Sequence, residues 1–476
     1  MSTTVGRREK PDKSPFAVAP KEDLLYSLAQ DGSRRWIDPV VTNGRFYKLR
    51  LGLAVALIAL FLGLPLVQIA GKPGIFLDLA RRQFTFFGAT FHPTDNLILL
   101  SFGATIIISV FAVTALFGRA WCGFGCPQPI YMEFVYRPLE RLFEGSRRGA
   151  LAKAGAGERV VRLSAKWLAF TAISAFLAAT FTAYFVGWAE LVPGVFIAPA
   201  DNKGPLVVVL ALTVAMLIDF GYFRDQMCTV ACPYGRLQTV LYDPDTVIVG
   251  YDSRRGEPRG RRVSGANDVA LGDCVDCSRC ITTCPTGMDI RRGLQMECIG
   301  CAQCIEACDE VMVKLNKAPG LIRFTSQREL DTGRRQFWRP RLAIYSVVFM
   351  VALGGLLGLA YGRKPAGFEV LRSGREPFRM LPNGDVANIL RLRVTNNLHE
   401  SQGFTVTLAE PHDAHLVVSE SPLVVPGDGV GTVELVVTAE DDLFEHNGGQ
   451  STARFVVTTS NGVTFTKTFI LLGPAS

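Results

Sequence analysis

Five runs without a charged residue constrain the fold of this chain more than any other feature. A helix needs about 20 apolar residues to cross the hydrocarbon core of a bilayer. In a chain of 476 residues that is 49% hydrophobic and only 20% charged, such runs indicate a membrane protein with about five transmembrane α-helices. The runs lie at residues 51–70, 96–118, 167–189, 204–218 and 342–362.

The fourth run is the weakest, because Asp219 interrupts it before it continues to residue 223. A buried or re-entrant segment is the alternative there. We predict a span, since losing it would place the cysteine-rich region and the C-terminal tail on inconsistent sides. Asp219 itself either faces a polar interior or lies at the cytoplasmic interface, with Arg224 as a candidate partner.

The orientation follows from basic residues in the short loops, which are retained in the cytoplasm. Residues 119–166 carry nine Lys and Arg, against three in residues 72–95 and one in residues 190–203. The N-terminus, residues 119–166 and the cysteine-rich region are therefore expected in the cytoplasm and the tail outside. The first run follows a polar stretch, so we expect an uncleaved anchor.

The tail after the last run has its own composition. It holds nine basic and thirteen acidic residues, a net charge of −4 in a chain of +7, and no cysteine. Alternating apolar runs separated by Pro, Asn, Asp and Gly turns predict an antiparallel sandwich of about seven strands, resembling an immunoglobulin fold. The clearest runs are residues 388–394, 404–408, 432–437, 454–459 and 463–470.

The strongest chemical signal is a doubled cysteine run, CVDCSRCITTCP from residue 274 and CIGCAQCIEACD from residue 298. Each has the C-x2-C-x2-C-x3-C spacing of bacterial ferredoxins, in which the fourth cysteine ligates the other cluster. This rule gives two [4Fe-4S] clusters. The first takes Cys274, Cys277, Cys280 and Cys308, and the second takes Cys298, Cys301, Cys304 and Cys284. Zinc sites are the alternative reading of C-x2-C pairs.

The other four cysteines form a repeat, CGFGCP at residues 122–127 and CTVACP at residues 228–233. Each copy follows an apolar run at its cytoplasmic end, and the proline disfavours helix at the cysteine before it. Two such edges would gather Cys122, Cys126, Cys228 and Cys232, soft thiols that suit Cu(I). The alternatives are simple packing of small apolar side chains and a transient disulfide.

Several cofactors and partners are excluded. None of the five histidines lies in an apolar run, so a transmembrane haem relay lacks axial ligands. We find neither a dinucleotide fingerprint nor a phosphate loop. The basic run at residues 254–262 lies between apolar runs and is better explained as a cytoplasmic retention signal or docking surface than as a nucleic-acid site.

Taken together, these features resemble the FixG/CcoG family of membrane polyferredoxins, which act in assembly of cbb3-type cytochrome c oxidase. The likeness spans nearly the whole chain. The residues that carry it are GRFYKLR (44–50), AWCGFGCPQ (120–128), CTVACPYGR (228–236), VGYDSRRGEPRG (249–260), residues 272–312 and GLIRF (320–324).

The resemblance implies reduction of Cu(II) to Cu(I) on the cytoplasmic side, with copper as substrate or transient ligand at the four edge cysteines. It also implies copper-export and copper-chaperone proteins as partners, a cytoplasmic electron donor whose identity is open, and possible association of several copies. Two rival functions remain. One is a quinone-linked membrane ferredoxin that serves another redox enzyme, and the other is a non-enzymatic scaffold whose outer domain binds assembly partners.

The sequence therefore predicts a cytoplasmic segment, a membrane region, a ferredoxin domain and an outer domain. Their predicted bounds are 1–47 for the cytoplasmic segment, 48–223 for the first four spans, 224–270 for a linker with the second edge, 271–312 for the ferredoxin domain, 313–341 for a second linker, 342–362 for the fifth span and 363–476 for the outer domain.

Overall fold

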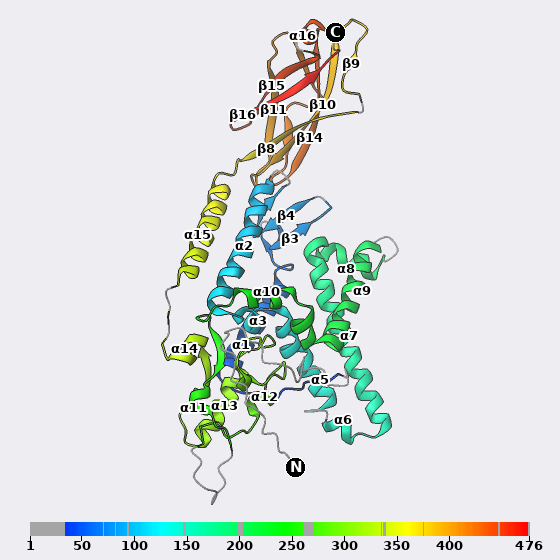
Figure 1. Cartoon of the computed structure of the whole chain (residues 1–476). Helices are drawn as coiled ribbons and strands as arrows, with labels where there is room; N and C mark the ends of the chain where they lie inside the picture. The colour runs from blue at the N-terminus through cyan, green and yellow to red at the C-terminus, as the bar shows by residue number, and fades with distance from the viewer. Residues whose placement is uncertain are drawn as a thin grey trace, which may run out of the picture. The chain divides into compact units, whose positions relative to one another are not determined.

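The computed structural model divides into two compact units, which are described separately below (Figure 1). The first comprises Met1–Val67 and Gly103–Gly354, and the second Gln68–Phe102 and Gly355–Ser476. The residues described are 34–69, 71–80, 82–92, 95–145, 149–198, 203–260, 271–334, 336, 339–374, 376–445 and 448–474. Most of the predicted N-terminal segment lies outside these residues.

Within the described ranges, five helices are long and apolar enough to cross a membrane, which agrees with the predicted number of spans. The helix that contains Asp219 is 21 residues long, and its last turn is a π-helix, η4 (Asp219–Phe223). The five are α1 (Arg45–Gly63), α2 (Asn96–Phe117), α7 (Ala156–Val186), α9 with η4 (Lys203–Phe223) and α15 (Pro340–Tyr361).

Helix α7 is longer than its uncharged run, because charged residues continue it beyond the apolar stretch. It begins at residue 156 rather than 167. Within this extension Arg162 pairs with Glu158, and Lys166 reaches the buried Glu144 at 2.5 Å. A helix that carries such pairs continues where the apolar run has ended.

Short helices follow the second and fourth spans and connect the membrane helices of the first unit. After α2 come α3 (Ala120–Phe124), α4 (Pro127–Tyr131), η2 (Met132–Tyr136), α5 (Arg137–Glu144) and α6 (Gly149–Lys153); α8 (Trp188–Phe196) follows α7. After η4 come η5 (Met227–Ala231) and α10 (Pro233–Leu241).

The ferredoxin region is a small domain around a two-stranded antiparallel sheet. Strand β6 (Ile248–Tyr251) pairs with β7 (Ile322–Thr325), and Val249, Met288 and Ile322 are buried beside the cysteine loops. Its helices are α11 (Ser253–Gly256), α12 (Arg279–Thr282), η6 (Ile290–Arg292), α13 (Gln303–Lys314) and α14 (Gln327–Thr332).

The second unit contains the predicted sandwich, with an apolar core that includes Leu390, Phe404 and Phe455. One sheet has the order β12-β14-β10-β8, with β9 also on β10, and the other β13-β11-β15-β16. Nine strands therefore replace the seven expected. They are β8 (Ala366–Arg372), β9 (Arg379–Met380), β10 (Val386–Asn396), β11 (Gln402–Glu410), β12 (His415–Val418), β13 (Leu423–Val425), β14 (Val430–Ala439), β15 (Gln450–Thr459) and β16 (Thr464–Leu472); α16 (Asp442–Glu445) precedes β15.

The loop between the first two spans is folded rather than irregular, and it belongs to the same unit as the sandwich. Arg363 holds Asp95 at 2.8 Å, and Lys72 lies 3.9 Å from Asp428. No sequence pattern predicted this association between the loop and the sandwich. The loop contains β1 (Gln68–Ile69), β2 (Lys72–Pro73), β3 (Ile75–Asp78), β4 (Gln83–Phe86) and β5 (Ala89–Phe91).

Candidate iron-sulfur and thiol site

The first predicted ligand set lines one small cavity of the ferredoxin domain. Cys274, Cys277 and Cys280 come from the loop that leads into α12, and Cys308 comes from α13. Among these four, Cys277 alone is exposed to solvent. The four cysteines of the first crossed set thus share one cavity, and their ligation of a cluster stays a prediction.

The second predicted set lines a neighbouring cavity. Its wall contains Cys284, Cys298, Cys301 and Cys304, together with Cys280 from the first set. One cysteine is therefore common to both cavities, which places the two cavities side by side. Within the described residues, no three His, Cys, Asp or Glu side chains are placed to hold a single metal ion, and the eight cysteines line two cavities instead.

The two cysteine loops have the same backbone path. The residue after the second cysteine of each run, Ser278 or Ala302, adopts a left-handed conformation with φ of 58° or 63°. These residues also precede α12 and α13 as their N-caps. Each loop therefore wraps around its cavity before it enters a helix, as the spacing rule requires.

Arg50 provides a test of whether an iron-sulfur cluster fits the second cavity. Its side chain is 1% exposed, and its two terminal nitrogens have no hydrogen-bond partner among the described residues. Burial raises the pKa of Cys301 to about 12, and the nearby Arg50 charge opposes that shift. Buried donors of this kind suit the sulfur atoms of an anionic cluster, so the residues fit the predicted group.

The two edge motifs have matching local geometry. Cys126 and Cys232 are extended, with ψ of 129° and 113°, and each is the N-cap of a helix that starts at the following proline, α4 or α10. Proline is favourable at the first helical position, where no backbone donor is needed. The chain thus turns at the second cysteine of each edge, as predicted.

The four edge cysteines lie close together. Burial, and then the neighbouring thiols of Cys126, Cys122 and Cys232, raise the pKa of Cys228. Burial also raises the pKa of Cys126 to about 11, with contributions from Cys122 and Cys232. The sulfur of Cys122 donates to Oε1 of the buried Gln238 at 3.6 Å. The duplicated edges therefore bring these four thiols, called the thiol cluster below, into one region, although no three of them are placed around a single metal ion in the described part of the chain.

The second cysteine loop lies directly against this thiol cluster. Cys122 is near enough to Cys298 to contribute to its raised pKa, after burial. A Cβ atom on Gly123 would lie 2.8 Å from the backbone oxygen of Ile299, so backbone contacts backbone here. Cys228 faces a small cavity that Ile299 and Thr286 also line. The second cavity, rather than the first, therefore adjoins the edge cysteines.

Arg119 connects the first edge, the second edge and the second cysteine loop. In the sequence it is recognisable only as one of the basic residues that indicate topology. Its guanidinium donates to the carbonyl oxygens of Met296 and Cys298, the latter at 3.1 Å, and to that of Gly235 at 2.8 Å. Arg50 donates from Nε to the Gly123 oxygen at 2.8 Å. The only sequence signal that Arg119 positions the second cysteine loop is its place three residues before Cys122.

The expected pairing of Asp219 with Arg224 is wrong. Arg224 forms a two-bond ion pair with Glu140, at 2.8 and 2.9 Å. Asp219 accepts a hydrogen bond from Gln128 at 2.9 Å, and Gln128 also donates to the Arg224 oxygen. Gln128 lies just after the first edge motif, far from Asp219 in the sequence. The residue spacing along the fourth span therefore could not predict it as the partner of Asp219.

Three family models match parts of the chain. Residues 223–327 match a 4Fe-4S dicluster domain, residues 99–145 a 4Fe-4S binding domain, and residues 356–474 the immunoglobulin-like fold at the C-terminal of FixG. The second of these ranges contains Cys122 and Cys126.

Curated relatives match over most of their length. Protein RdxA of Cereibacter sphaeroides is 30% identical over 383 residues, covering 77% of this chain and 80% of the relative. Nitrogen fixation protein FixG of Rhizobium meliloti is 28% identical, with 79% of each chain covered. Protein RdxB of Cereibacter sphaeroides is 29% identical, covering 82% of this chain and 86% of the relative.

Proposed function

Because this chain belongs to the FixG family, as its likeness to RdxA, FixG and RdxB shows, we propose that it is a membrane cupric reductase. It reduces Cu(II) to Cu(I) on the cytoplasmic side of the bacterial inner membrane, for the copper centre of a cbb3-type oxidase. One observation carries the proposal: the backbone beside Cys122 contacts Ile299 of the second cysteine loop, and Cys228 lines a small cavity with the same Ile299, so both edges adjoin the second iron-sulfur cavity.

Iron-sulfur clusters, when bound by the eight ferredoxin cysteines, supply single electrons. The edge cysteines hold the copper substrate, since thiolates are soft ligands that favour Cu(I) over Cu(II). Copper binding displaces thiol protons, because the ligand form of cysteine is the thiolate. Gln238 accepts from Cys122 in the thiol form and thereby orients it.

The partners follow from this assignment. A cytoplasmic donor reduces the protein, and copper-export and copper-chaperone proteins receive Cu(I). The sandwich of the second unit lies outside in this proposal and is available to assembly partners there. The acidic balance of the tail and the basic loop at residues 119–166 support that orientation.

A second role for the edge cysteines is favoured by one comparison. The family model that covers residues 99–145 is described as a 4Fe-4S binding domain, and that range includes the first edge. The four edge cysteines would then bind a further iron-sulfur cluster. In this role the chain is still an electron-transfer protein. The edge thiols would then be cluster ligands and would not be available to bind copper.

One experiment tests both roles. The purified full-length protein is reduced anaerobically, freed of reductant and mixed with Cu(II), while cluster absorbance and a Cu(I)-specific chelator are followed. We expect reoxidation and Cu(I) formation to slow at least tenfold when all four edge cysteines are changed to serine. Iron should stay at about eight atoms per chain, as two [4Fe-4S] clusters require.

The matched control is Thr229→Ala, which lies between Cys228 and Cys232 and should leave the rate unchanged. Reoxidation at the original rate in the four-serine variant would refute copper reduction at the edge. Loss of about four iron atoms per chain in that variant would instead establish the further cluster.

A further inference from the structure

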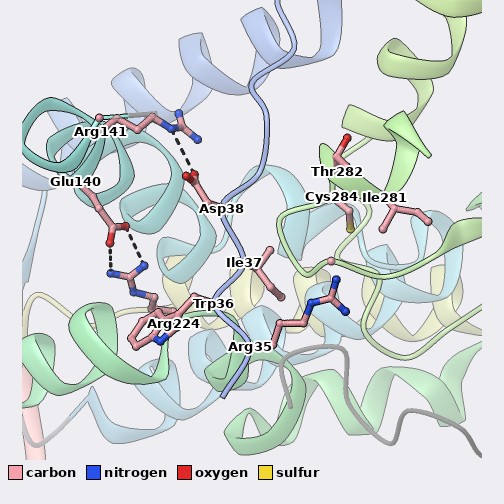
Figure 2. A pocket seen from close by; sticks show the side chains of 12 residues that line it. Arg35, Trp36, Ile37, Asp38, Glu140, Arg141, Arg224, Ile281, Thr282 and Cys284 are labelled. Carbon is pink, nitrogen blue, oxygen red and sulfur yellow. Dashed lines mark hydrogen bonds and ion pairs between the residues drawn. The ribbon is translucent and has the colours of Figure 1, made fainter. Parts of the chain in front are cut away.

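A cavity of the size of a small-molecule site lies on another side of the second iron-sulfur site. Its volume is about 520 Å³, within the roughly 300–1,000 Å³ of small-molecule sites. Figure 2 shows its walls. One wall contains Cys284, the cysteine that the crossed ligation rule assigns to the second cluster, with Ile281 and Thr282 beside it.

The opposite wall contains two ion pairs. Glu140 and Arg224 form a two-bond ion pair, and Arg141 lies 3.9 Å from Asp38 and donates to the Pro39 oxygen at 3.0 Å (Figure 2). These four charges compensate one another. The charged side chains of this wall therefore have partners without a ligand.

One cation of the cavity has no such partner. The exposed Arg35 makes no hydrogen bond or ion pair with any described residue. The neighbouring Trp36 is 42% exposed, and the guanidinium carbons of Arg34 and Arg224 lie 4.1 and 4.9 Å from the centroid of its ring. Arg35 therefore offers a free guanidinium at the cavity, and this group binds phosphate in a forked geometry.

The thiol cluster does not open into this cavity. Of the edge cysteines, Cys228 faces a different and much smaller cavity, and none of the four lines the large one. A ligand in the large cavity would thus approach Cys284 without blocking the copper site. This separation suits a reductant that enters while the substrate is bound elsewhere.

We propose that this cavity is the electron-entry site and that it binds a reduced flavin carrying a phosphate group, with the phosphate on Arg35 and the ring system toward Cys284. The proposal rests on the proposed function, because it supplies the electrons that copper reduction consumes. Reduced flavin mononucleotide gives up two electrons and two protons and becomes oxidised flavin. Each of the two clusters gains one electron, and the protons leave to water at the exposed mouth. A hydride donor would not serve directly, since a one-electron centre cannot take a hydride.

The test measures binding before turnover. Anaerobic titration of the full-length protein with flavin mononucleotide, followed by flavin fluorescence, gives a dissociation constant. We expect Arg35→Glu to weaken this binding at least tenfold and Arg35→Lys to weaken it about threefold or less. Riboflavin, which lacks the phosphate, should bind the wild type and Arg35→Glu equally. Arg334→Glu, an exposed arginine outside the cavity, is the matched control.

A second arm measures electron entry. Stopped-flow mixing with reduced flavin mononucleotide should bleach the cluster absorbance at least tenfold more slowly in Arg35→Glu than in the wild type. Equal flavin binding or equal bleaching in the two proteins overturns the electron-entry site. Protein reduced chemically and then mixed with Cu(II) tests the proposed function separately, because that step needs no flavin.

Discussion

At the scale of single residues, buried charge decides how the site is held together. Arg119 is 7% exposed and binds carbonyl oxygens of both the second cysteine loop and the second edge. Arg50 binds the first edge through the Gly123 oxygen, and its terminal nitrogens have no hydrogen-bond partner among the described residues. These arginines act through the backbone, so they position the site and do not react.

Arg119→Gln should loosen the contact between the second cysteine loop and the edges. Each carbonyl left without its donor costs about 1–3 kcal/mol when buried. We expect a lower thermal midpoint and a selective loss of the second cluster, measured by iron content and by EPR of the reduced protein. Arg334→Gln is the control. Two intact clusters with an unchanged midpoint in Arg119→Gln would contradict this positioning.

His92 in the second unit should make that unit sensitive to acid. The residue is fully buried, its ring nitrogens lack hydrogen-bond partners among the described residues, and Asp95, Asp428, Arg363 and Lys72 are the charges that face it. Burial lowers its pKa. A histidine with a lowered folded-state pKa contributes stability above its unfolded pKa of about 6.5, and that stability is lost as the pH falls.

Hydrogen exchange of residues 71–92, corrected for its intrinsic pH dependence, measures this effect. Protection should fall between pH 8 and pH 5.5 in the wild type and stay nearly constant in His92→Phe. His412→Gln, at an exposed position, should behave as the wild type. The same loss of protection in His92→Phe would show that another group is responsible.

At the scale of elements, the start of α1 explains why GRFYKLR belongs to the site. Glu306 of α13 accepts from the backbone nitrogens of Phe46 and Tyr47 and from the Thr42 hydroxyl, and so caps α1 from outside. The N-cap of α1, Gly44, has no side chain to do this. The ferredoxin domain thus supplies the acceptor that the first span lacks.

The contact of α3 with the second cysteine loop predicts the effect of a single methyl group. In Gly123→Ala the new Cβ would meet the Ile299 oxygen at 2.8 Å and the Gly300 backbone at 2.9 Å. We expect destabilisation of about 1–3 kcal/mol, as for overpacking elsewhere. Thermal unfolding and cluster absorbance measure it.

Gly52→Ala is the matched control, because its Cβ would meet nothing within 4 Å in α1. Helix propensity should make it neutral or stabilising by up to about 1 kcal/mol. Equal midpoints for the two alanine variants would show that α3 does not contact the cysteine loop this closely.

At the scale of the whole molecule, the predicted topology places the fifth span between the cysteine-rich region on one side of the membrane and the tail on the other. The loop at residues 68–95 and the sandwich share one unit. The predicted orientation places both the loop at residues 68–95 and the sandwich outside, so it requires that they be able to share one unit.

Protease added to spheroplasts should therefore digest or release the C-terminal domain and leave the ferredoxin domain intact. After lysis, both domains should become accessible. Antibodies to tags at the two ends of the chain follow the fragments. Cleavage within residues 271–334 of intact spheroplasts would reverse the predicted topology.

The sequence by itself determined the parts of this protein. Apolar length predicts the five spans, since each must satisfy its backbone within one helix to cross a bilayer. Period-two alternation predicts the sandwich, and the cysteine spacing predicts two sets of four, because these are local patterns. Extra strands such as β9 and the folded loop at residues 68–95 escaped prediction, since two- to four-residue strands carry too little pattern.

Only the tertiary structure decided how the parts meet. The grouping of the four edge cysteines depends on two hairpins that are 106 residues apart in the sequence and touch the same ferredoxin loop. Arg119, Arg50 and Glu306 act across separations that no spacing rule covers. Asp219 accepts a hydrogen bond from Gln128, and Arg224 forms an ion pair with Glu140. Both partners are distant in the sequence, so no spacing rule predicts them. Local pattern specifies an element, whereas a buried charge takes whichever partner the packing brings within reach.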